Sequence, residues 1–508
     1  MSSEQVIRTV DASFPLTGEQ KQALFLAEEG QSFKINAFAG TGKTTTIKAI
    51  AENSPNKSCL YLAFNSSIAS EVKSNAPKNL EVCTVHQYAR RQLLRAGYHS
   101  KLSEPSINYS RNIKKLFLSH PELNGAPIQA VNIGLSILYE FCKSPTLEIA
   151  FQPEGCAAKK LRNWVAADSP SFLAGHNDGY SKLMAACVLI ANKMWAITIS
   201  KDSPIPLSFD FYLKLWQLEL LPSDFDLIFV DEAQDLDPVM FAGISDMGKQ
   251  LILVGDTYQQ IYQWRGAINA IGKVKSPLLY LTQTFRFPPS IANVANICLK
   301  RLGESRKILS RLPEPPLENH NKLTVINRTN LSVIKKSILY ARKGFQIEVR
   351  LSIRGGLYGL KSLCADIAKL KLGSKQSNPL IADYGTFPEL LEDEKKGNAG
   401  PDVSNCLSLL SSYGFDVEIL NRDIDLLVEK SKSVCAIPDI IVCTAHAAKG
   451  REWDYVEIGD DFESKLLAGG STFLDELRLF YVAITRAKRH LINHQYVEQL
   501  ALSASKIS

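Results

Sequence analysis

The chain alternates short, continuous apolar runs with longer amphipathic stretches over its 508 residues. A first group of apolar runs reads "FKINAF", "CLYLAF", "EVCTV", "DLIFVDE" and "QLILVGD". A second group reads "LLYLTQ", "KLTVINR", "IIVCTAH", "YVEIGD" and "RHLINHQ". Continuous apolar strands that alternate with helices indicate parallel sheets covered on both faces. The two groups therefore predict an α/β protein with two parallel-sheet cores.

Two mainly helical insertions are expected in these cores. The first covers residues 92–205, with segments such as "IQAVNIGLSILYEFCKS", and divides the first core into residues 1–91 and 206–278. The second is shorter, residues 351–431, and divides the second core into residues 279–350 and 432–508. It contains the polar stretch "EDEKKGNAGPDVSN", residues 392–405, which we expect to be a mobile loop.

Composition narrows the class of protein. Apolar residues make up 45% of the chain and charged residues 22%, which is typical of a soluble globular protein. The best apolar stretch, residues 185–197, is short for a membrane span and is broken by Asn192 and Lys193. The 10 cysteines include no C-x-x-C pair, so we expect reduced thiols without a zinc or iron–sulfur site. With no visible secretory signal, we expect a cytoplasmic protein, or a nuclear one in a eukaryote.

A glycine-containing loop lies between the first strand and a helix, in "INAFAGTGKTTTIKAI". Gly40 and Gly42 would let backbone N–H groups approach phosphates, and the helix N-terminus adds partial positive charge. Lys43 can reach the outer phosphates, and Thr44 can hold Mg²⁺. The alternative is a glycine turn that binds no ligand.

A pair of acidic residues strengthens the phosphate-binding interpretation. The segment "DLIFVDEAQD" places Asp231 and Glu232 at the end of an apolar strand, where two carboxylates are unfavourable unless they meet a cation or a proton-transfer task. Asp231 is the expected Mg²⁺ ligand, and Glu232 is the expected base that activates water. A pair of solvated charges in a turn is the alternative. Together the two motifs predict hydrolysis of a nucleoside triphosphate.

Five motifs, of which the acidic pair belongs to the first, occur in this order: "VDEAQD", "VGDTYQQIYQWRGA", "LTQTFRF", "TAHAAKGREWD" and "LFYVAITRAKRHL". They resemble the motifs of superfamily 1 helicases of the UvrD/Rep group, whose phosphate loop also has alanine at the position of Ala37. The resemblance implies two RecA-like motor cores of the P-loop NTPase type, with ATP and Mg²⁺ as cofactors. "NAFAGTGKT", "AFNSSIA" and "YLKLWQL" resemble the F-box DNA helicase branch, although the chain begins so near its first motif that we expect no F-box.

The resemblance also implies the roles of individual nucleotide-side residues. Gln20 would read the adenine edge, Phe285 would stack on the base, and Gln259 would sense the γ-phosphate. Arg286 and Arg486 would act as arginine fingers, with a surface salt bridge as the alternative for each. The remaining expected nucleotide contacts are Ala39, Gly40, Thr41, Gly42, Lys43, Thr44, Thr45 and Glu452.

Aromatic and basic residues form the expected DNA track. Phe64 follows a strand, and Tyr262, Trp264 and Arg265 share a turn, where bases can stack without regard to sequence. For Trp264 the alternative is burial between domains. The other expected DNA contacts, implied by the resemblance, are Asn65, His86, His446 and Lys449.

These features predict an ATP-dependent DNA helicase or translocase that acts in repair or recombination on single-stranded and tailed duplex DNA. The resemblance implies movement from 3′ to 5′. An alternative is an ATPase subunit of a larger assembly, for example beside a nuclease in bacterial anti-phage defence, with weak unwinding alone. A binding module without catalysis is a third hypothesis, which Lys43, Asp231 and Glu232 disfavour. A protein partner such as a nuclease or repair factor stays open, and no membrane partner is expected.

Overall fold

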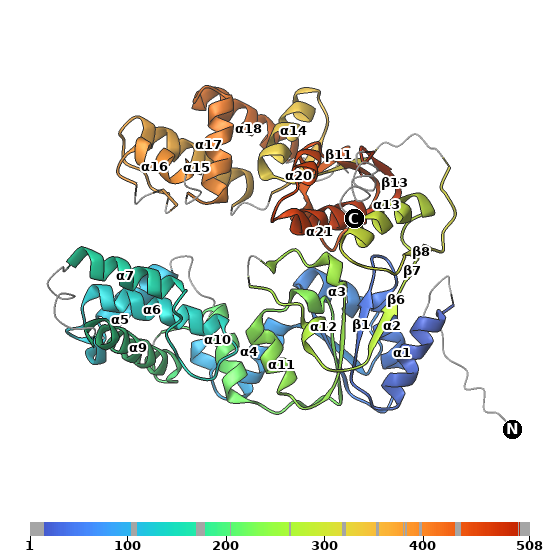
Figure 1. The fold of residues 1–508 in the computed structure, drawn as a ribbon, viewed down its shortest axis with the longest axis horizontal. Helices are drawn as coiled ribbons and strands as arrows, with labels where there is room; N and C mark the ends of the chain where they lie inside the picture. The colour runs from blue at the N-terminus through green and yellow to red at the C-terminus, as the bar shows by residue number, and fades with distance from the viewer. Residues whose placement is uncertain are drawn as a thin grey trace. The chain divides into compact units, whose positions relative to one another are not determined.

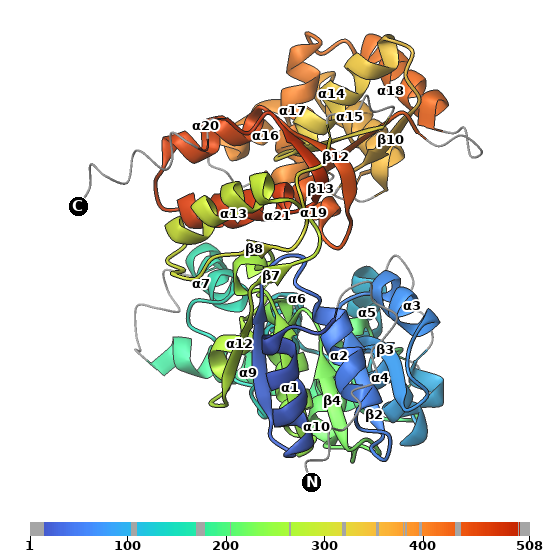
Figure 2. The same ribbon diagram turned by 90° about the vertical axis from the view of Figure 1, so that its right-hand side faces the viewer.

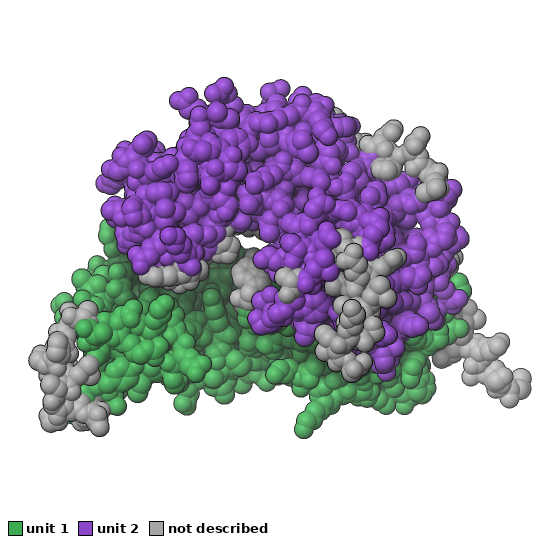
Figure 3. All heavy atoms as spheres, turned by 45° about the horizontal axis from the view of Figure 1, so that its top comes forward, with its two compact units in different colours: residues 1–37, 43–281 green, residues 38–42, 282–508 purple. Residues whose placement is uncertain are grey.

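The structure is a computed structural model. It describes residues 15–102, 109–168, 178–203, 205–263, 266–316, 322–351, 355–378, 380–381, 384–395, 399–431, 438–495 and 497. The chain divides into two compact units, which Figure 3 colours separately. Unit 1 comprises residues 1–37 and 43–281, and unit 2 comprises residues 38–42 and 282–508. Each unit contains one large parallel sheet, which confirms the predicted α/β class with two cores.

Unit 1 is built on a six-stranded parallel sheet in the order β3-β2-β4-β5-β1-β6. Its strands are β1 (Phe33–Ala37), β2 (Cys59–Ala63), β3 (Leu80–Thr84), β4 (Leu227–Val230), β5 (Gln250–Gly255) and β6 (Leu278–Leu281). Every residue of β2 and β4 is buried, because helices cover both faces of the sheet. Their continuous apolar runs are therefore explained by burial on two sides (Figure 2).

One predicted strand belongs to the other sheet. We assigned "LLYLTQ" to the second core, but β6 pairs with β1 in unit 1, with Ile35 opposite Leu279. The grouping was wrong because an apolar run carries no information about which sheet it joins. The longer segment of unit 2 begins at Thr282. The boundaries expected around the two insertions stay predictions.

The helices of unit 1 fall into those beside the sheet and those of the first insertion, which gather in one bundle (Figure 1). Beside the sheet lie α1 (Gly18–Glu28), α2 (Lys43–Glu52), α3 (Ser66–Ser74), α4 (Val85–Arg95), α10 (Phe209–Glu219), α11 (Pro238–Ser245) and α12 (Ala270–Lys273). The bundle contains α5 (Tyr109–Leu118), α6 (Ile128–Lys143), α7 (Cys156–Asp168) and α9 (Asp178–Ile199).

Helix α9 is longer than the sequence suggested. Its segment Gly179–Ile199 is the one helix among the described residues that is long and apolar enough, by length and composition, to cross a membrane. Our expectation of a short, broken stretch was wrong, because the helix continues through Asn192 and Lys193. Cys187 and Ala191 are fully buried against α6 residues, so α9 also packs as a core helix of the bundle.

Unit 2 contains a five-stranded parallel sheet in the order β10-β11-β9-β12-β13 and a pair of two-residue strands. The strands are β7 (Gln283–Thr284), β8 (Leu309–Ser310), β9 (Leu323–Asn327), β10 (Ile347–Arg350), β11 (Ile440–Thr444), β12 (Trp453–Ile458) and β13 (Ala487–Ile492). Sequence reasoning missed β10, an edge strand in which only Ile347 is fully buried. An edge strand with polar positions lacks the continuous apolar run that identified its neighbours.

The helices found among the described residues of unit 2 lie either around its sheet or in the second insertion. Around the sheet lie α13 (Pro289–Arg301), α14 (Asn330–Arg342), α19 (Ala445–Ala448), α20 (Asp461–Ala468) and α21 (Phe473–Ile484), and α13 lies beside α21 (Figure 2). The insertion contains α15 (Gly356–Lys371), α16 (Phe387–Lys395), α17 (Pro401–Ser412) and α18 (Val417–Ser431). The loop expected over residues 392–405 is wrong over most of that length, because α16 extends to Lys395 and α17 begins at Pro401. Proline at the first helical position favours this start.

A buried carboxylate anchors the connection that follows α15. Asp366 is 2% exposed and accepts hydrogen bonds from the backbone N–H groups of Ser377 and Asn378, from the Ser377 hydroxyl, and from Lys369. Burial alone would raise the pKa of Asp366, but these hydrogen bonds outweigh burial and hold it at about 2. The charged form of Asp366 therefore stabilises this part of unit 2.

We expect Asp366→Ala to lower the free energy of unfolding at pH 7 by about 1.5–3 kcal/mol, the range for hydrogen bonds to a charged group. Because the folded pKa lies below the usual value near 4, the wild-type advantage is full above about pH 4. It should disappear as the pH falls from about 4 to about 2. Urea unfolding followed by circular dichroism at several pH values measures this difference.

Asp425 offers a matched control, since it lies in the same insertion, pairs with Lys361 and is 62% exposed. Asp425→Ala should change the stability by less than about 1 kcal/mol. An equal loss in both variants, or a loss for Asp366→Ala that does not depend on pH, would contradict the anchoring role.

Candidate functional site

The candidate site of unit 1 lies where three neighbouring strands end. β4, β5 and β1 are adjacent and parallel, so their carboxyl ends meet at one edge of the sheet. The glycine loop follows β1, Asp231 and Glu232 follow β4, and Asp256 follows β5. Ligands of open α/β sheets bind at such an edge. The fold thus brings together three motifs that are far apart in the sequence.

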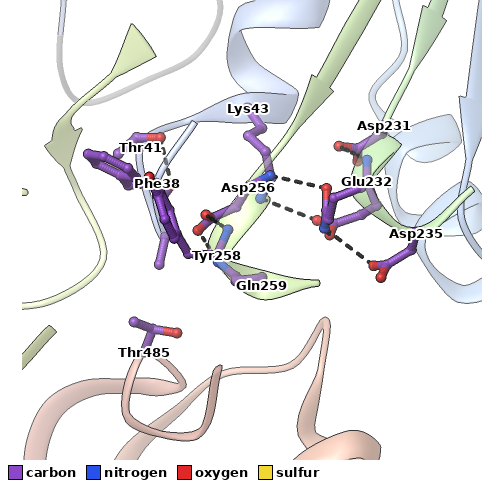
Figure 4. Close-up of polar contacts among 12 residues, drawn as sticks. Phe38, Thr41, Lys43, Asp231, Glu232, Asp235, Asp256, Tyr258, Gln259 and Thr485 are labelled. Carbon is purple, nitrogen blue, oxygen red and sulfur yellow. Dashed lines mark hydrogen bonds and ion pairs between the residues drawn. The ribbon is translucent and has the colours of Figure 1, made fainter. Parts of the chain in front are cut away.

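The loop lysine and the acidic pair are in contact. Lys43 Nζ lies 3.2 Å from Glu232 Oε1, an ion pair drawn in Figure 4. Glu232 has a φ of 53°, in the left-handed region that non-glycine residues seldom occupy. Backbone outliers of this kind often occur at functional sites, because the surroundings must hold them in place. The proposed base is therefore held in a specific, unfavourable conformation beside the loop.

A tyrosine that sequence reasoning missed joins the two predicted metal ligands. The fully buried Tyr61, on β2, donates a hydrogen bond to Asp231 Oδ2 over 2.5 Å and also hydrogen-bonds the Thr44 side chain. Asp231 Oδ1 accepts from the Glu232 backbone N–H over 2.9 Å. Tyr61 lies within the apolar run "CLYLAF", which predicts a buried strand but does not indicate a polar role for its hydroxyl. The contact places Thr44 and Asp231 around one phenol.

The electrostatics of this edge favour a bound cation. Burial, followed by the nearby Glu232 carboxylate, raises the pKa of Asp231. Burial likewise raises the pKa of Asp256, while Lys43 opposes this shift. Crowded buried carboxylates are stabilised by positive charge, which Lys43 supplies in part and a divalent cation would supply further. Thr44 and Asp231 therefore fit Mg²⁺ in chemical type.

Gln234 is a second functional candidate that the sequence did not indicate. It is 0% exposed, in the short helical turn after β4, and its Nε2 donates to Glu232 Oε2 over 2.6 Å. The same nitrogen donates to Asp235 Oδ2 over 3.3 Å, and Gln234 Oε1 accepts from the Asp256 backbone N–H over 3.1 Å. This amide connects the segment after β4 to the segment after β5.

The predicted phosphate sensor lies in the segment after β5. Gln259 is 3% exposed, and its Nε2 donates to Asp256 Oδ2 over 2.7 Å (Figure 4). Asp256 Oδ1 accepts from the Tyr258 backbone N–H over 3.0 Å, which caps this short turn. The structure therefore brings Lys43, Asp231, Glu232 and Gln259 to the same edge of unit 1. Their catalytic roles stay predictions.

The tip of the glycine loop, residues 38–42, groups with unit 2. The Phe285 backbone N–H donates to Gly40 O over 2.9 Å, and the Ala39 N–H donates to the Tyr481 hydroxyl over 3.4 Å. Gly40 has a φ of 72°, and a Cβ there would lie 2.4 Å from Arg286 Cβ. No other residue type fits at Gly40 without displacing its neighbours.

The two predicted arginine fingers share a partner in unit 2. Arg286 Nη1 donates to Thr485 O over 3.1 Å, and Arg286 Nη2 lies 2.5 Å from Glu452 Oε1. Arg486 is 3% exposed, with its Nη2 donating to Thr485 Oγ1 and its Nε donating to Val482 O. The structure thus brings Arg286, Arg486 and Glu452 together around Thr485. Both guanidinium groups have protein partners here, and their role as fingers stays a prediction.

The remaining nucleotide-side residues have local structural roles. Gln20 caps α1: its Oε1 accepts from the Thr17 N–H over 2.9 Å, and its Nε2 donates to Thr46 Oγ1 over 3.1 Å. Thr41 is buried, and its hydroxyl donates to Phe38 O over 2.8 Å. Thr45 lies half-buried in the first turn of α2. The adenine contact predicted for Gln20 stays a prediction.

Two predicted DNA contacts come together on unit 1. The rings of Phe64 and Tyr262 stack with centroids 5.6 Å apart and an interplanar angle of 17°. Phe64 is 38% exposed, so one aromatic surface of this pair is accessible. Asn65, next to Phe64, caps α3 by accepting from the Ile68 N–H. Trp264 and Arg265, which we expected in the same track, lie outside the described residues.

The other predicted DNA contacts are separate from this pair in sequence. His86 is half-buried on α4, where its Nδ1 lies 3.0 Å from the Tyr212 hydroxyl and its ring meets the exposed Phe209 edge-on. Burial lowers the pKa of His86, which favours a neutral ring near pH 7. His446 lies on α19 in unit 2, and Lys449 follows that helix directly.

Comparisons with known protein families agree with this geometry. A family model described as the UvrD/REP helicase N-terminal domain matches residues 16–276. A second model, described as the UvrD-like helicase C-terminal domain, matches residues 368–496. The first match includes all three segments at the sheet edge of unit 1. The second includes the segments that carry Glu452 and Arg486.

Individual relatives match along nearly the whole chain. F-box DNA helicase 1 of Gallus gallus is 30% identical over 97% of this chain and 50% of its own length. F-box DNA helicase protein 1 of Schizosaccharomyces pombe is 28% identical over 96% of this chain and 58% of its own length. A probable DNA helicase II homolog of Mycoplasma genitalium is 23% identical over 93% of this chain. The chain thus spans about half the length of these two F-box relatives.

Proposed function

We propose that this chain, which belongs to the UvrD/Rep helicase family, is an ATP-driven motor that moves along single-stranded DNA. We further propose movement from 3′ to 5′ and a role in DNA repair or recombination. The observation that carries the proposal is the contact of Lys43 with Glu232 at the edge where Asp231 and Gln259 also lie. A cation, a carboxylate pair and an amide at a phosphate loop form the set of groups that NTP hydrolysis requires.

The hydrolytic step is assigned to the residues of this edge. Lys43 would bind the outer phosphates, and Glu232 would take the proton of the attacking water. Thr44 and Asp231 would hold Mg²⁺, which when bound neutralises charge on the phosphate oxygens. Gln259 would sense the γ-phosphate, and Arg286 and Arg486 would neutralise the transferring phosphoryl group as arginine fingers. The order of these residues along the chain is that of the family motifs.

DNA binding is assigned to the aromatic pair of unit 1. Phe64 is exposed and stacks on Tyr262, which follows the phosphate sensor segment by three residues. Aromatic platforms bind successive bases without sequence preference, which suits a motor that must move along any strand. Trp264 and Arg265 would extend this track. His86, His446 and Lys449 are the proposed contacts to the backbone.

We expect Lys43→Ala to abolish ATP hydrolysis, because it removes the cation that would bind the outer phosphates. Glu232→Gln should keep ATP binding and lose turnover by at least about 100-fold, because an amide cannot take the proton. Glu219→Gln is the control, since Glu219 is an exposed residue that accepts from Tyr98 elsewhere in unit 1. Steady-state hydrolysis and fluorescent-nucleotide binding measure the two properties. A wild-type rate for Glu232→Gln would show that the base is another residue.

We expect single-stranded DNA to raise the ATPase rate, and the purified chain to displace the strand of a 3′-tailed duplex but not of a 5′-tailed one. Both the DNA stimulation of the ATPase and the strand displacement should decrease as the salt concentration increases, because binding to DNA phosphates releases counterions. An ATPase rate that does not change over a range of DNA concentrations would rule out the translocase. DNA-stimulated hydrolysis without strand displacement would favour the alternative of a motor subunit within a larger assembly.

We expect Phe64→Ala to weaken binding of a labelled oligothymidine by about 1–3 kcal/mol, because one stacking platform is lost. The basal ATPase rate should stay at the wild-type value. Phe25→Ala is a matched control, since Phe25 is a 59% exposed aromatic residue on α1 with no proposed DNA role. Fluorescence anisotropy measures the affinity. Equal affinities for the Phe64 and Phe25 variants would place the DNA track elsewhere.

A further inference from the structure

Gln234 occupies a closed polar environment at the centre of the unit 1 site. Its side chain is 0% exposed, and its amide contacts three separate groups. The orientation of the amide is unambiguous, because the Asp256 backbone N–H can only donate and must therefore face Oε1. The NH₂ group consequently faces the carboxylates of Glu232 and Asp235, where both of its contacts are donations.

The two oxygens of Glu232 have different partners. Lys43 lies 3.2 Å from Oε1, whereas Gln234 Nε2 donates to Oε2 over 2.6 Å. In the proposed function Lys43 binds the outer phosphates of ATP. Gln234 then holds the other carboxylate oxygen of Glu232, whose backbone has the unfavourable φ of 53°. A hydrogen bond to a carboxylate is among the stronger polar contacts in proteins.

The other end of the amide reaches the segment that carries the phosphate sensor and a stacked aromatic ring. Gln234 Oε1 accepts from the Asp256 N–H, and the Asp256 carboxylate in turn accepts from Gln259 over 2.7 Å. Three residues after Gln259, Tyr262 stacks on Phe64. A continuous path of hydrogen bonds, ring stacking and backbone therefore runs from the aromatic pair to Glu232, and all of it lies within unit 1.

Gly255 allows the Gln234 amide to approach the backbone closely, which supports a specific packing of these two residues. A Cβ at Gly255 would lie 2.1 Å from Gln234 Oε1 and 3.0 Å from the Ala233 backbone nitrogen. The backbone of Gly255 is not in the left-handed region, so the requirement for glycine comes from the close approach of the amide. Any side chain at this position must displace Gln234.

We propose that Gln234 is a positioning residue that holds the base Glu232 and transmits to it the position of the segment from Asp256 to Tyr262. Strand binding at the Phe64–Tyr262 pair then raises hydrolysis through this amide. The inference rests on the proposed function, because it assumes that Glu232 is the base and that DNA binds at the aromatic pair. It adds a route by which one site regulates the other.

The test compares three variants of the full chain with the wild type. Gln234→Met keeps the length of the side chain and removes all three polar contacts of the amide. Gln234→Glu keeps an oxygen that can accept from the Asp256 N–H but replaces the donor toward Glu232. Gly255→Ala leaves Gln234 in the chain and displaces it. The control is Gln217→Met, which removes another buried amide of unit 1, one bonded to Pro145 O and Lys214.

We expect all three test variants to lower the DNA-stimulated kcat by roughly 10- to 100-fold, the scale of a lost hydrogen bond to a charged group. The ratio of stimulated to basal rate should fall toward one. The KM for ATP, the affinity for fluorescent nucleotide and the affinity for oligothymidine should each stay within about twofold, because Gln234 has no proposed contact with either ligand. The control Gln217→Met should lower the melting temperature as much as the test variants do. It should nevertheless keep the wild-type kcat and the wild-type ratio of stimulated to basal rate.

Several results would overturn the inference. A wild-type kcat and stimulation ratio for Gln234→Met would show that the amide does not position the base. If the basal and the DNA-stimulated rates fall by the same factor, Gln234 does not transmit strand binding to Glu232. If the test variants lose ATP affinity in proportion to their loss in melting temperature, and the control Gln217→Met does the same, the role of Gln234 is structural only. Failure of the proposed function itself is recognised separately, by a wild-type enzyme that DNA does not stimulate or by an active Glu232→Gln, and either result also refutes the inference.

Discussion

Two adjacent carboxylates at the end of a fully buried strand impose the constraint around which unit 1 is organised. Asp231 and Glu232 follow β4, whose four residues are all buried, and burial raises the pKa of Asp231. Such groups are tolerated only where hydrogen bonds and positive charge compensate for lost water. Tyr61, Gln234 and Lys43 supply this compensation in the structure. The same side chains that stabilise the fold therefore also arrange the proposed catalytic groups.

The order of the strands determines which of these groups can meet. Because β4 and β5 are neighbours, the segments after them are close enough for a single glutamine to join Glu232 to Asp256. The phosphate loop joins this edge because β1 lies on the other side of β5. The proposed motor would need the nucleotide and the strand to influence one another, and such coupling requires differential contacts in each state. The polar network after β4 and β5 offers such contacts within one unit.

The insertions differ from the cores in how they are stabilised. The first is a bundle whose helices α6 and α9 pack through small and branched residues such as Ala130, Ile133 and Ala191. The second has its own buried cluster and the Asp366 anchor after α15. The residues identified at the sheet edge of the candidate site, Lys43, Asp231, Glu232, Gln234 and Gln259, all lie outside the two insertions in sequence.

Local pattern was enough to predict the two α/β cores, five strands of the first sheet and the segments that follow them, because burial on two faces imposes continuous apolar runs. It also indicated Lys43, Asp231 and Glu232 as candidates, and the structure brings these residues to one sheet edge while their roles stay predictions. The sheet that β6 joins, the edge strand β10 and the roles of Tyr61 and Gln234 emerged only from the folded chain. The reason is physical: strand pairing and side-chain hydrogen bonds depend on neighbours that are distant in sequence. Tyr61 meets Asp231 across 170 residues, a separation that no local pattern encodes.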